Sequence, residues 1–589
     1  MTVNPNNSDC SLRANQMGLN PGKETCRELI VDTYQQFSYS FPNIKPSFLQ
    51  QYVRRFLMKN TFFIIIAIFA ASFAFASVQE GKELFEAKCG SCHSLERSLR
   101  KTKGLKSWKR TIKRMASYTR GRTSETEEEK IAEYLAERGK PKEPAPHKTS
   151  KQEIKVPEEQ ELFEFEKVRV NQFIDPSVCS GCHSEIFKQW GGSMHSKAFY
   201  DPIWRKATKL FFKEAVSKEE IIEMKACVKC HTPLGFRSYS ISSPGDDYDK
   251  LTQLPAQGIF CNWCHNIDEV KHIGDARYEV APGGGEEDPS TMLGPRKDAT
   301  SDFHPTKYSE LHTKSEFCGL CHNVSHAANK LPLEQTYDEW KNSPYNTGNS
   351  ETTINCQDCH MRQKPGLPST GKTERPDNPG KAADGGPFRK HVWTHYFVGA
   401  NAIVTKLLGS DVHAQMAIER LKHAADLKLI KTSSYKRNEL SYIKIKVINS
   451  GAGHYLPTGL TEVRQMWLSV VINDARGKTI FKSGSLDKNG NINEGSVVYY
   501  TQLGNEKGEP VLNVAMADRI LYDRRIPPKG YLIEKYAFQI PSDTVSPLTV
   551  EAVLKYRSAS QSLAKELLGE SAPKIPVIDM VGLVDKIEF

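Results

Sequence analysis

Cys179-Ser-Gly-Cys182-His183 is the first of five Cys-x-x-Cys-His motifs that lie between residues 179 and 360. The other four are Cys227-Val-Lys-Cys230-His231, Cys261-Asn-Trp-Cys264-His265, Cys318-Gly-Leu-Cys321-His322 and Cys356-Gln-Asp-Cys359-His360. A sixth copy, Cys89-Gly-Ser-Cys92-His93, lies upstream of this block. In such a motif each thiol adds across a haem vinyl group, and the histidine that follows is placed under the iron as an axial ligand. The sequence therefore predicts six covalently bound c-type haems.

The alternative interpretations of Cys-x-x-Cys are a zinc site, a redox dithiol and a structural disulfide. A zinc site pairs two Cys-x-x-Cys units and needs no histidine at the next position, and a thioredoxin-like dithiol occurs once rather than six times. If histidine followed by chance, six of six would occur on the order of once in a billion. Zinc ribbons stay as the main alternative.

Residues 58–76 have the pattern of a secretory signal peptide. Lys59 supplies a basic start, an apolar stretch follows from residue 62, and Ala74-Phe75-Ala76 is a cleavage signal. The alternative, an uncleaved anchor, would rest on the stretch 62–76, which is only 15 residues long and short of the roughly 20 needed to span a bilayer. We therefore expect cleavage after Ala76 and a periplasmic or extracellular protein, where covalent haem attachment takes place in bacteria.

Residues 1–57 precede this signal, which favours translation from Met58 and an upstream extension that belongs to a misplaced gene start. Cys10 and Cys26 lie in that extension, so the remaining 12 of the 14 cysteines all belong to Cys-x-x-Cys-His motifs. No structural disulfide is expected.

Residues 77–139 are predicted to form a small α-helical domain around the first motif. Trp108, Ile112 and Met115 share one helical face, and Ser124 with Glu127 forms a capping box for a further helix. The segment resembles class I cytochromes c, which implies that Met115 is the sixth iron ligand of this haem, while a core methionine is the alternative. Four prolines among charged residues then mark residues 140–160 as a linker.

Positive charge is concentrated beside this first motif. The chain carries a net charge of +10, and the segment from Arg97 to Arg122 holds 11 Lys or Arg and no acidic residue. This favours docking of an acidic redox partner protein near residues 97–122, with a solvated helix face as the alternative. An exported protein is not expected to bind nucleic acid, and membrane association is expected only if the signal segment stays uncleaved.

Residues 161–430 are predicted to be a pentahaem domain of mainly α-helical and irregular structure. Five attachment sites in 182 residues leave so little chain per haem that the macrocycles themselves must form the core. Ten histidines outside the motifs and the linker are available as distal ligands: His195, His272, His304, His312, His326, His391, His395, His413, His423 and His454. His413 and His423 are interpreted as ordinary helix residues.

Several phrases resemble the multihaem cytochrome family typified by the tetrahaem electron carrier of ammonia oxidisers. They include Gln189-Trp190-Gly-Gly-Ser193-Met-His195, Gly258-Ile-Phe-Cys261, His304-Pro-Thr-Lys-Tyr-Ser-Glu-Leu-His312, Thr336-Tyr-Asp-Glu-Trp340 and Cys356-Gln-Asp-Cys-His-Met361. The resemblance covers roughly residues 170–400 and implies bis-histidine haems, with His195, His304, His312 and His395 as distal ligands. His391 competes with His395, and His272 and His326 are reserves. This chain has five motifs in the block rather than four, so individual pairings do not transfer.

Residues 431–589 are predicted to form a β-sandwich of about seven strands. Ile443, Ile445 and Val447 alternate with lysines, and similar runs occur at 465–473, 496–502, 531–540 and 548–556. Gly451-Ala-Gly453-His454 resembles a phrase of multihaem cytochromes in which the histidine faces a haem, so His454 is a further expected ligand, with a turn histidine as the alternative. Asp487-Lys-Asn489-Gly490-Asn491 favours a hairpin over a calcium loop.

The sequence thus predicts a multidomain protein: an exported hexahaem cytochrome that transfers electrons along its haems. Two alternatives stay open. One is an oxidoreductase acting on a small nitrogen or sulfur species at a five-coordinate haem, although the lysine motif variant of pentahaem nitrite reductases is absent and octahaem hydroxylamine oxidoreductases have more haems. The other is a subunit of an extracellular haem filament.

Overall fold

The computed structural model describes residues 79–89, 105–118, 123–138, 165–251, 253–432 and 434–589. The chain divides into two compact units. The described part of the first unit runs from residue 79 to 138, and that of the second from residue 165 to 589. The predicted extension, signal segment and linker lie outside the described residues.

The first unit is helical, as the sequence predicts. A short π-helix, η1 (Phe85–Cys89), is followed by α5 (Leu105–Tyr118) and α6 (Glu125–Arg138). Ser124 and Glu127 form the predicted capping box: the Ser124 amide donates to Glu127 Oε2 over 2.8 Å, and the Glu127 amide donates to Ser124 Oγ over 3.3 Å. The core contains Phe85, Trp108, Ile112, Ile131, Tyr134 and Leu135.

Part of the basic charge of this unit is neutralised within it. Lys109 Nζ lies 2.7 Å from Glu129 Oε1, and Lys113 Nζ lies 3.6 Å from Glu125 Oε1. The segment from Arg97 to Arg122 has no acidic residue of its own, and both carboxylates come from the next helix, α6.

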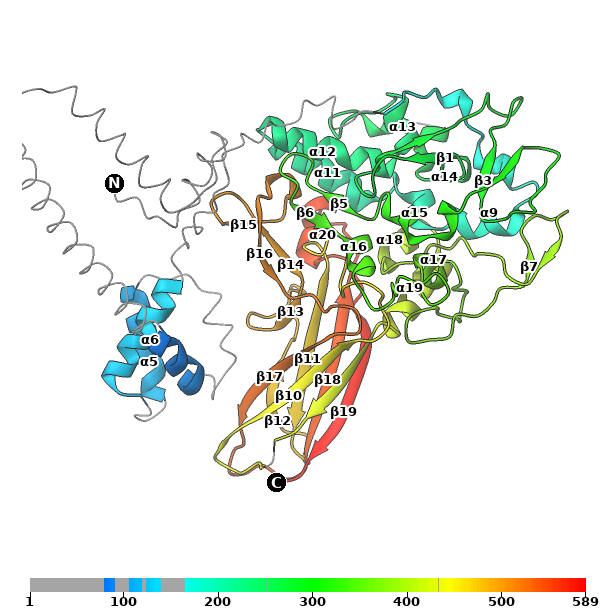
Figure 1. Cartoon of the computed structure of the whole chain (residues 1–589). Helices are drawn as coiled ribbons and strands as arrows, with labels where there is room; N and C mark the ends of the chain where they lie inside the picture. The colour runs from blue at the N-terminus through cyan, green and yellow to red at the C-terminus, as the bar shows by residue number, and fades with distance from the viewer. Residues whose placement is uncertain (1–78, 90–104, 119–122, 139–164, 252, 433) are drawn as a thin grey trace, which may run out of the picture. The chain divides into compact units, whose positions relative to one another are not determined.

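The helical part of the second unit surrounds the five motifs (Figure 1). Its helices are α8 (Pro176–Cys179), α9 (Ser184–Gly191), α10 (Met194–Lys197), α11 (Pro202–Glu214), α12 (Lys218–His231), α13 (Pro233–Arg237), α14 (Cys261–Cys264), α15 (Ser315–Gly319), α16 (Thr336–Lys341), α17 (Cys356–His360), α18 (Ala402–Leu407) and α19 (Asp411–Lys422). Single turns of 3₁₀-helix lie at Val170–Gln172 (η2), Tyr248–Lys250 (η3), Leu254–Gln257 (η4) and Leu311–Thr313 (η5). Most helices are short because each needs only enough turns to hold one motif or one ligand.

Four two-stranded pairs brace the loops between these helices. They are β1 (Ile267–Val270) with β2 (Tyr278–Val280), β3 (Met292–Gly294) with β4 (Thr306–Tyr308), β5 (Val324–Ser325) with β6 (Pro332–Glu334), and β7 (Gly380–Lys381) with β8 (Phe388–Arg389). Only the β3–β4 pair is parallel.

The C-terminal part is rich in β-structure. One sheet has the strand order β17 (Tyr531–Gln539), β10 (Leu440–Asn449), β9 (Ala425–Ile430), and the second has the order β12 (Thr479–Ser483), β11 (Gln465–Asn473), β18 (Leu548–Arg557), β19 (Ile578–Ile587), with β13 (Val497–Tyr499) also paired to β11. A small sheet contains β14 (Thr501–Gly504), β15 (Pro510–Val511) and β16 (Arg519–Asp523). A short helix, α20 (Gln561–Leu568), and a 3₁₀ turn, η6 (Val514–Met516), complete the region.

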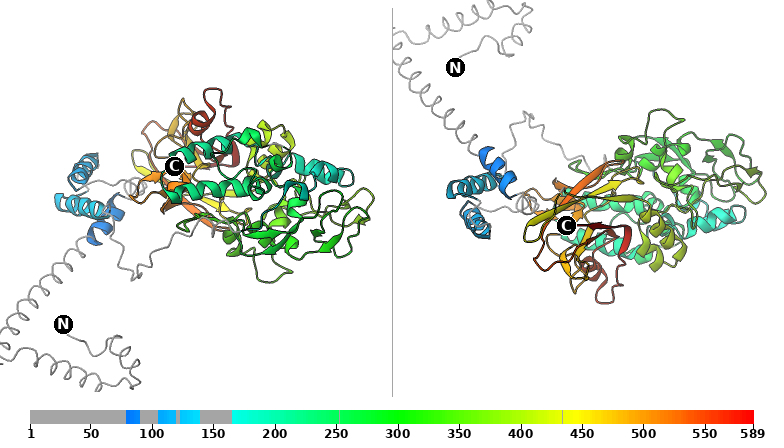
Figure 2. Two further views of the ribbon diagram at one scale, coloured as in Figure 1. Left: turned by 90° about the horizontal axis from the view of Figure 1, so that it is seen from above. Right: turned by 90° about the horizontal axis from the view of Figure 1, so that it is seen from below.

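The two larger sheets share one core. Their inward-facing residues alternate along the strands and include Ile443, Ile445, Val447, Met466, Leu468, Val470, Val550, Ala552 and Leu554, all fully buried. The predicted hairpin at Asp487 is present, since the Asp487 amide donates to the Asn491 carbonyl and Gly490 has φ +81°. Figure 1 shows the long strands running away from the helices toward the C terminus, and the views from above and below show the two regions adjoining (Figure 2).

Strand β9 lies on the helical side of the predicted boundary at residue 430. Helix α19 ends at Lys422, and residues 425–430 form β9, which pairs along β10. Ala425, Leu427 and Leu429 point into the core of the sheets, so this six-residue run packs with the β-rich region. The described residues from 165 to 589 form a single compact unit. Among the described residues, no helix is long and apolar enough to cross a bilayer.

Candidate haem-binding site

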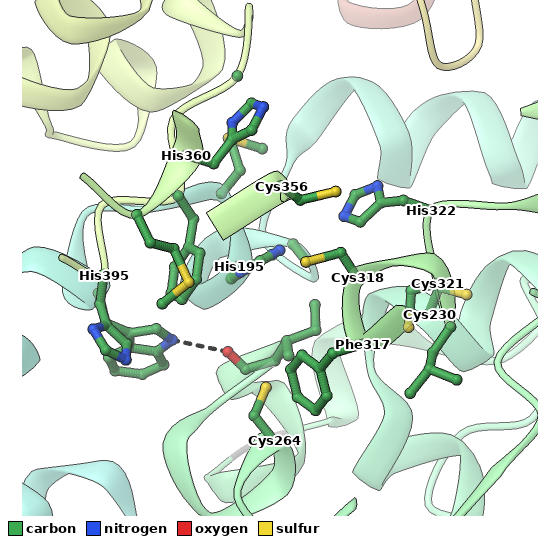
Figure 3. A pocket seen from close by; sticks show the side chains of 18 of the residues that line it. His195, Cys230, Cys264, Phe317, Cys318, Cys321, His322, Cys356, His360 and His395 are labelled. Carbon is green, nitrogen blue, oxygen red and sulfur yellow. Dashed lines mark hydrogen bonds between the residues drawn. The ribbon is translucent and has the colours of Figure 1, made fainter. Parts of the chain in front are cut away.

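A cavity of about 1570 Å³ runs through the second unit. Ordinary ligand pockets have volumes of about 300–1000 Å³. Its wall includes all ten described motif cysteines, namely Cys179, Cys182, Cys227, Cys230, Cys261, Cys264, Cys318, Cys321, Cys356 and Cys359, and the motif histidines His183, His231, His265, His322 and His360. Figure 3 shows side chains of the motifs at Cys227, Cys261, Cys318 and Cys356 lining it. The lining is mainly apolar elsewhere, which suits a large flat apolar cofactor.

Each motif histidine is fixed through its Nδ1 atom. Nδ1 lies 2.7 Å from the Ala382 carbonyl oxygen for His183, 2.9 Å from that of Ala198 for His231, 2.6 Å from that of Leu293 for His265 and 2.9 Å from that of Val398 for His360. For His322, Nδ1 lies 3.2 Å from Glu334 Oε1. Metal-binding histidines characteristically donate their second ring N–H in this way, because the hydrogen bond sets the tautomer and leaves Nε2 for the metal.

Three motif histidines face a second histidine across the cavity. The ring centroids are 5.5 Å apart for His265 and His312, 6.2 Å for His195 and His322, and 6.5 Å for His360 and His454. A metal–imidazole bond is about 2.0 Å long, so two imidazoles that bind one metal ion from opposite sides have ring centres about 6 Å apart. The observed spacing therefore fits an iron held by each pair.

The expected distal histidines all line the cavity: His195, His304, His312, His395 and His454. Four of them also have Nδ1 fixed. It lies 2.9 Å from Ser309 Oγ for His312, 3.0 Å from the Trp393 carbonyl for His395, 2.8 Å from the Tyr455 carbonyl for His454 and 3.2 Å from the Pro305 carbonyl for His304. Nε2 of His312 also lies 3.3 Å from the Cys264 carbonyl oxygen, a contact that it would exchange for iron. His195 and His395 both contact the Phe397 ring, with centroids 4.6 Å and 5.3 Å from it. The structure does not pair His304 or His395 with a particular motif.

His183 and His231 have no histidine ring stacked opposite them within the described part of the chain. The ring of His231 is instead covered on one face by Trp204, with centroids 4.2 Å apart and an interplanar angle of 6°. A second ring, that of Tyr248, continues this stack at 5.4 Å and 4°. The motif at Cys227 thus has an anchored proximal ligand and no facing imidazole.

The other five histidines lie away from the cavity wall. His413 has both ring nitrogens occupied, with Nδ1 2.7 Å from Ser410 Oγ and Nε2 2.8 Å from the Gln189 carbonyl. His326 Nε2 lies 3.2 Å from the Ala515 carbonyl, and His423 Nδ1 lies 2.8 Å from the Glu419 carbonyl. His391 Nδ1 accepts the Asn378 amide proton, and His272 is exposed.

Sulfur atoms of different motifs meet in pairs. The thiols of Cys179 and Cys261, of Cys230 and Cys321, and of Cys318 and Cys356 lie close enough to shift each other's pKa. All ten described cysteines are free of disulfides. No group of three or more His, Cys, Asp or Glu side chains in the described residues is arranged to hold a bare metal ion. The thiols therefore do not form the four-ligand clusters that zinc requires.

Burial keeps four of the cavity histidines neutral. It lowers the pKa of His195 and His312 to about 3, and that of His231 and His395 to about 4. Neutral imidazole is the form that binds a metal, so these four side chains are ready for metal ligation at neutral pH. His322 differs: burial disfavours its charged form, but the hydrogen bond to Glu334 raises the pKa of His322 overall.

A charged cluster in the cavity wall was not predicted from the sequence. Glu334 accepts from His322, Arg464 donates to Tyr556 Oη over 3.3 Å, and Glu462 also lines the cavity with Oε1 buried and unpartnered. Burial raises the pKa of Glu462 to about 7. Glu334 ends strand β6, Glu462 and Arg464 lie in the turn before β11, and none belongs to a Cys-x-x-Cys-His motif, so no sequence signal separated them from surface charges.

The side chains of the first Cys-x-x-Cys-His motif lie outside the described part of the chain. Cys92 and His93 lie outside the described residues, and so do the side chains of Cys89 and Met115. Their predicted roles in haem attachment and iron ligation stay predictions.

Comparisons with known proteins agree with a cytochrome in part of the chain. The family model described as cytochrome c554 and c-prime matches residues 178–266, which hold three of the motifs. This is a shorter region than the resemblance at roughly 170–400 suggested. The search of curated proteins found no match.

Two solved structures are similar to the chain. The penta-heme cytochrome c552 from Thermochromatium tepidum is 20% identical over 70% of this chain and 98% of its own, with a TM-score of 0.47. The CARDB domain of a Pyrococcus furiosus protein, solved with di-metal ions, is 8% identical over 28% of this chain and 85% of its own, with a TM-score of 0.14. At these TM-scores neither likeness carries a conclusion about function.

Proposed function

We propose that this multihaem c-type cytochrome is an exported electron-transfer protein with six haems, five in the second unit and one in the first. The proposal includes cleavage of the signal segment after Ala76 and a periplasmic or extracellular location. Bound haem supplies one-electron oxidation and reduction at its iron. The protein's own residues attach, ligate and space the haems.

The observation that carries the proposal is the facing of imidazole pairs across the cavity. His265 with His312, His195 with His322, and His360 with His454 are all spaced for one iron between two rings. Ligation from both sides leaves no position for a substrate, which favours electron transfer over catalysis at these three motifs.

The contacts between motif thiols support a connected set of attachment points. Cys261 contacts Cys179, Cys321 contacts Cys230, and Cys318 contacts Cys356. Cys264 also lies near Cys318 and Cys321. The motif at Cys318 therefore has three other motifs as neighbours. This favours a branched arrangement of haems, with the haem at Cys318 at the branch point, over a linear chain.

The β-rich region contributes a histidine, His454, to the haem-binding cavity. His454 lies in the loop that follows β10, and Asn449 Nδ2 donates to its carbonyl oxygen over 2.8 Å. On the other side, Glu339 of α16 accepts the Tyr455 amide proton over 3.0 Å and the Thr458 hydroxyl over 2.6 Å. The loop is thus held between the sheet and the helical part with its histidine toward His360.

Spin-state counting of the purified protein tests this function. Electron paramagnetic resonance of the oxidised holoprotein, integrated against its haem content, separates low-spin from high-spin iron. We expect most of the haem, including the three paired motifs, to be low-spin. A spectrum dominated by high-spin haem would reject an electron-transfer role for these motifs.

One observation favours a second candidate function at a single motif. His231 is anchored by Ala198 but faces no histidine ring in the described residues, as expected for the oxidoreductase alternative with an open axial position. Nitrite, hydroxylamine or cyanide added to the oxidised protein then shifts the spectrum of one haem. No shift with any of the three would exclude this candidate.

A further inference from the structure

The outward face of the β17–β10–β9 sheet is basic. Lys428, Lys444, Lys446 and Lys535 project from it, by the alternation of burial along the three strands. Asp426 is the single acidic residue among the outward positions of these strands, and it pairs with Lys372. We call these four lysines, with Tyr442, Tyr531, Ile430 and Ile533 between them, the lysine face.

The lysines oppose one another across the strands. Lys446 is the direct partner of Lys428, and Lys444 is the direct partner of Lys535. Like charges at directly opposed positions destabilise a sheet. Lys428, Lys444 and Lys446 make no ion pair within the described part of the chain. Weaker contacts reduce the repulsion in part, since Asp426 attracts Lys428 and Lys446 lies over the Tyr531 ring. An arrangement that opposes folding is expected to serve another purpose.

Apolar side chains lie between the lysines. Tyr531 is 50% exposed, Ile533 46% and Ile430 39%. Lys446 Nζ lies 3.5 Å from the Tyr531 ring centroid, and Lys535 Nζ lies 4.2 Å from that of Tyr442. Exposed tyrosine and isoleucine beside positive charge have the composition of a protein interface, in which aromatic anchors are enriched.

The lysine face continues into the cavity wall. Its edge at Ile448 and Tyr531 adjoins Lys529, whose Nζ donates to the carbonyl oxygens of Gly371 and Ser450. Lys529 Nζ also lies 4.8 Å from the ring centroid of Tyr345, which lines the cavity beside Gly453. A partner on this face would therefore lie next to the loop that carries His454.

We propose that the lysine face is a docking surface for an acidic protein, which it positions beside the His360–His454 pair. Carboxylates of the partner remove the repulsion between the opposed lysines, and its apolar side chains cover Tyr531 and Ile533. The purpose of docking, electron exchange at this pair, rests on the proposed function, whereas the binding itself does not.

Charge complementarity and surface shape favour a protein over a lipid bilayer. The exposed apolar side chains lie in the middle of a sheet face instead of at protruding loop tips. A bilayer would need them to insert, while an acidic protein surface buries them in place. Anionic vesicles are therefore a contrasting arm of the test.

Poly-L-glutamate is a suitable probe because it carries the carboxylates without other chemistry. The full-length holoprotein is passed over immobilised poly-L-glutamate, and over vesicles containing phosphatidylglycerol, at low and high salt. We expect salt-sensitive binding to poly-L-glutamate and a roughly tenfold loss of affinity in Lys428→Glu/Lys446→Glu. Acetylation of lysines, mapped by mass spectrometry, should show Lys428, Lys444 and Lys446 protected by the probe.

The matched control is Lys482→Glu/Lys586→Glu, which makes the same change of charge on strands β12 and β19 of the other sheet. Equal loss in both double variants, no protection of the three lysines, or a loss confined to vesicles would overturn the proposal. The single variant Lys446→Glu places a carboxylate opposite Lys428, so its thermal midpoint should rise while its binding falls. Unchanged binding in this more stable variant would also overturn it.

Discussion

His360 and His454 face each other with ring centroids 6.5 Å apart and an interplanar angle of 26°. The first ends the last motif of the helical part, and the second lies 94 positions later, beyond strand β10. Both have Nδ1 bonded to a backbone carbonyl. One iron between them would link the helical and β-rich parts of the second unit.

Replacing His454 tests this link. In His454→Ala the haem at Cys356 loses its distal ligand, so one low-spin haem should become high-spin, and added imidazole should restore the low-spin signal. Electron paramagnetic resonance gives the count. The control is His423→Ala, because His423 lies in the same region but away from the cavity wall. A low-spin signal unchanged in His454→Ala would show that His454 is not a ligand.

Replacing Glu334 should raise the potential of one haem. Its carboxylate accepts from Nδ1 of His322 and so favours the more positive, oxidised iron. In Glu334→Gln the midpoint potential of that haem should rise by tens of millivolts, on the order of 1 kcal/mol for one electron. A spectroelectrochemical titration measures it, with the exposed Glu506→Gln as control. If Glu334→Gln and Glu506→Gln have the same midpoint potentials, Glu334 does not tune the potential of a haem.

Protonation of Glu462 should make a midpoint potential depend on pH near neutrality. Burial raises the pKa of Glu462 to about 7, and an electron added to a nearby iron makes protonation easier still. Reduction then takes up a proton, so the potential should fall as pH rises through about 7, by at most about 59 mV per pH unit. Titrations between pH 5.5 and about 8.5 should show this slope in the native protein and in Glu506→Gln. If the midpoint potential of Glu462→Gln still falls with pH in this way, a group other than Glu462 takes up the proton.

The predicted Met115 ligand gives the first-unit haem a distinct potential. Thioether ligation raises the potential above that of bis-histidine haems, so Met115→His should lower the highest-potential transition of the full-length protein. Met516→Leu, at a partly exposed methionine of the second unit, is the control. If the highest transition is the same in Met115→His, the methionine is a core residue and not a ligand.

The attachment sites were predictable because Cys-x-x-Cys-His is a local signal that the chemistry itself requires. The histidines that line the cavity were predicted partly by resemblance, since His195 and His312 stand in characteristic phrases. Which ring faces which motif depends on contacts such as His195 with His322, 127 positions apart, and no local pattern encodes these. Strand β9 was not predicted for the same reason: the alternation of buried and exposed residues along it is clear only once β10 lies beside it.

The charged residues of the cavity wall could not be predicted from the sequence for a further reason. Glu334, Glu462 and Arg464 are ordinary charged residues outside any motif, and their importance comes from burial, which only the folded chain shows. In the first unit the acidic residues of α6 are visible in the sequence, but their pairing with Lys109 and Lys113 is a matter of helix packing.

The most direct test of the central claim is the intact mass of the exported holoprotein. The account predicts a polypeptide beginning at Ser77 that carries the added mass of six covalently bound haems. Mutating both cysteines of any one motif should remove the mass of one haem. A mass equal to the bare polypeptide, or to the polypeptide with zinc, would contradict the account.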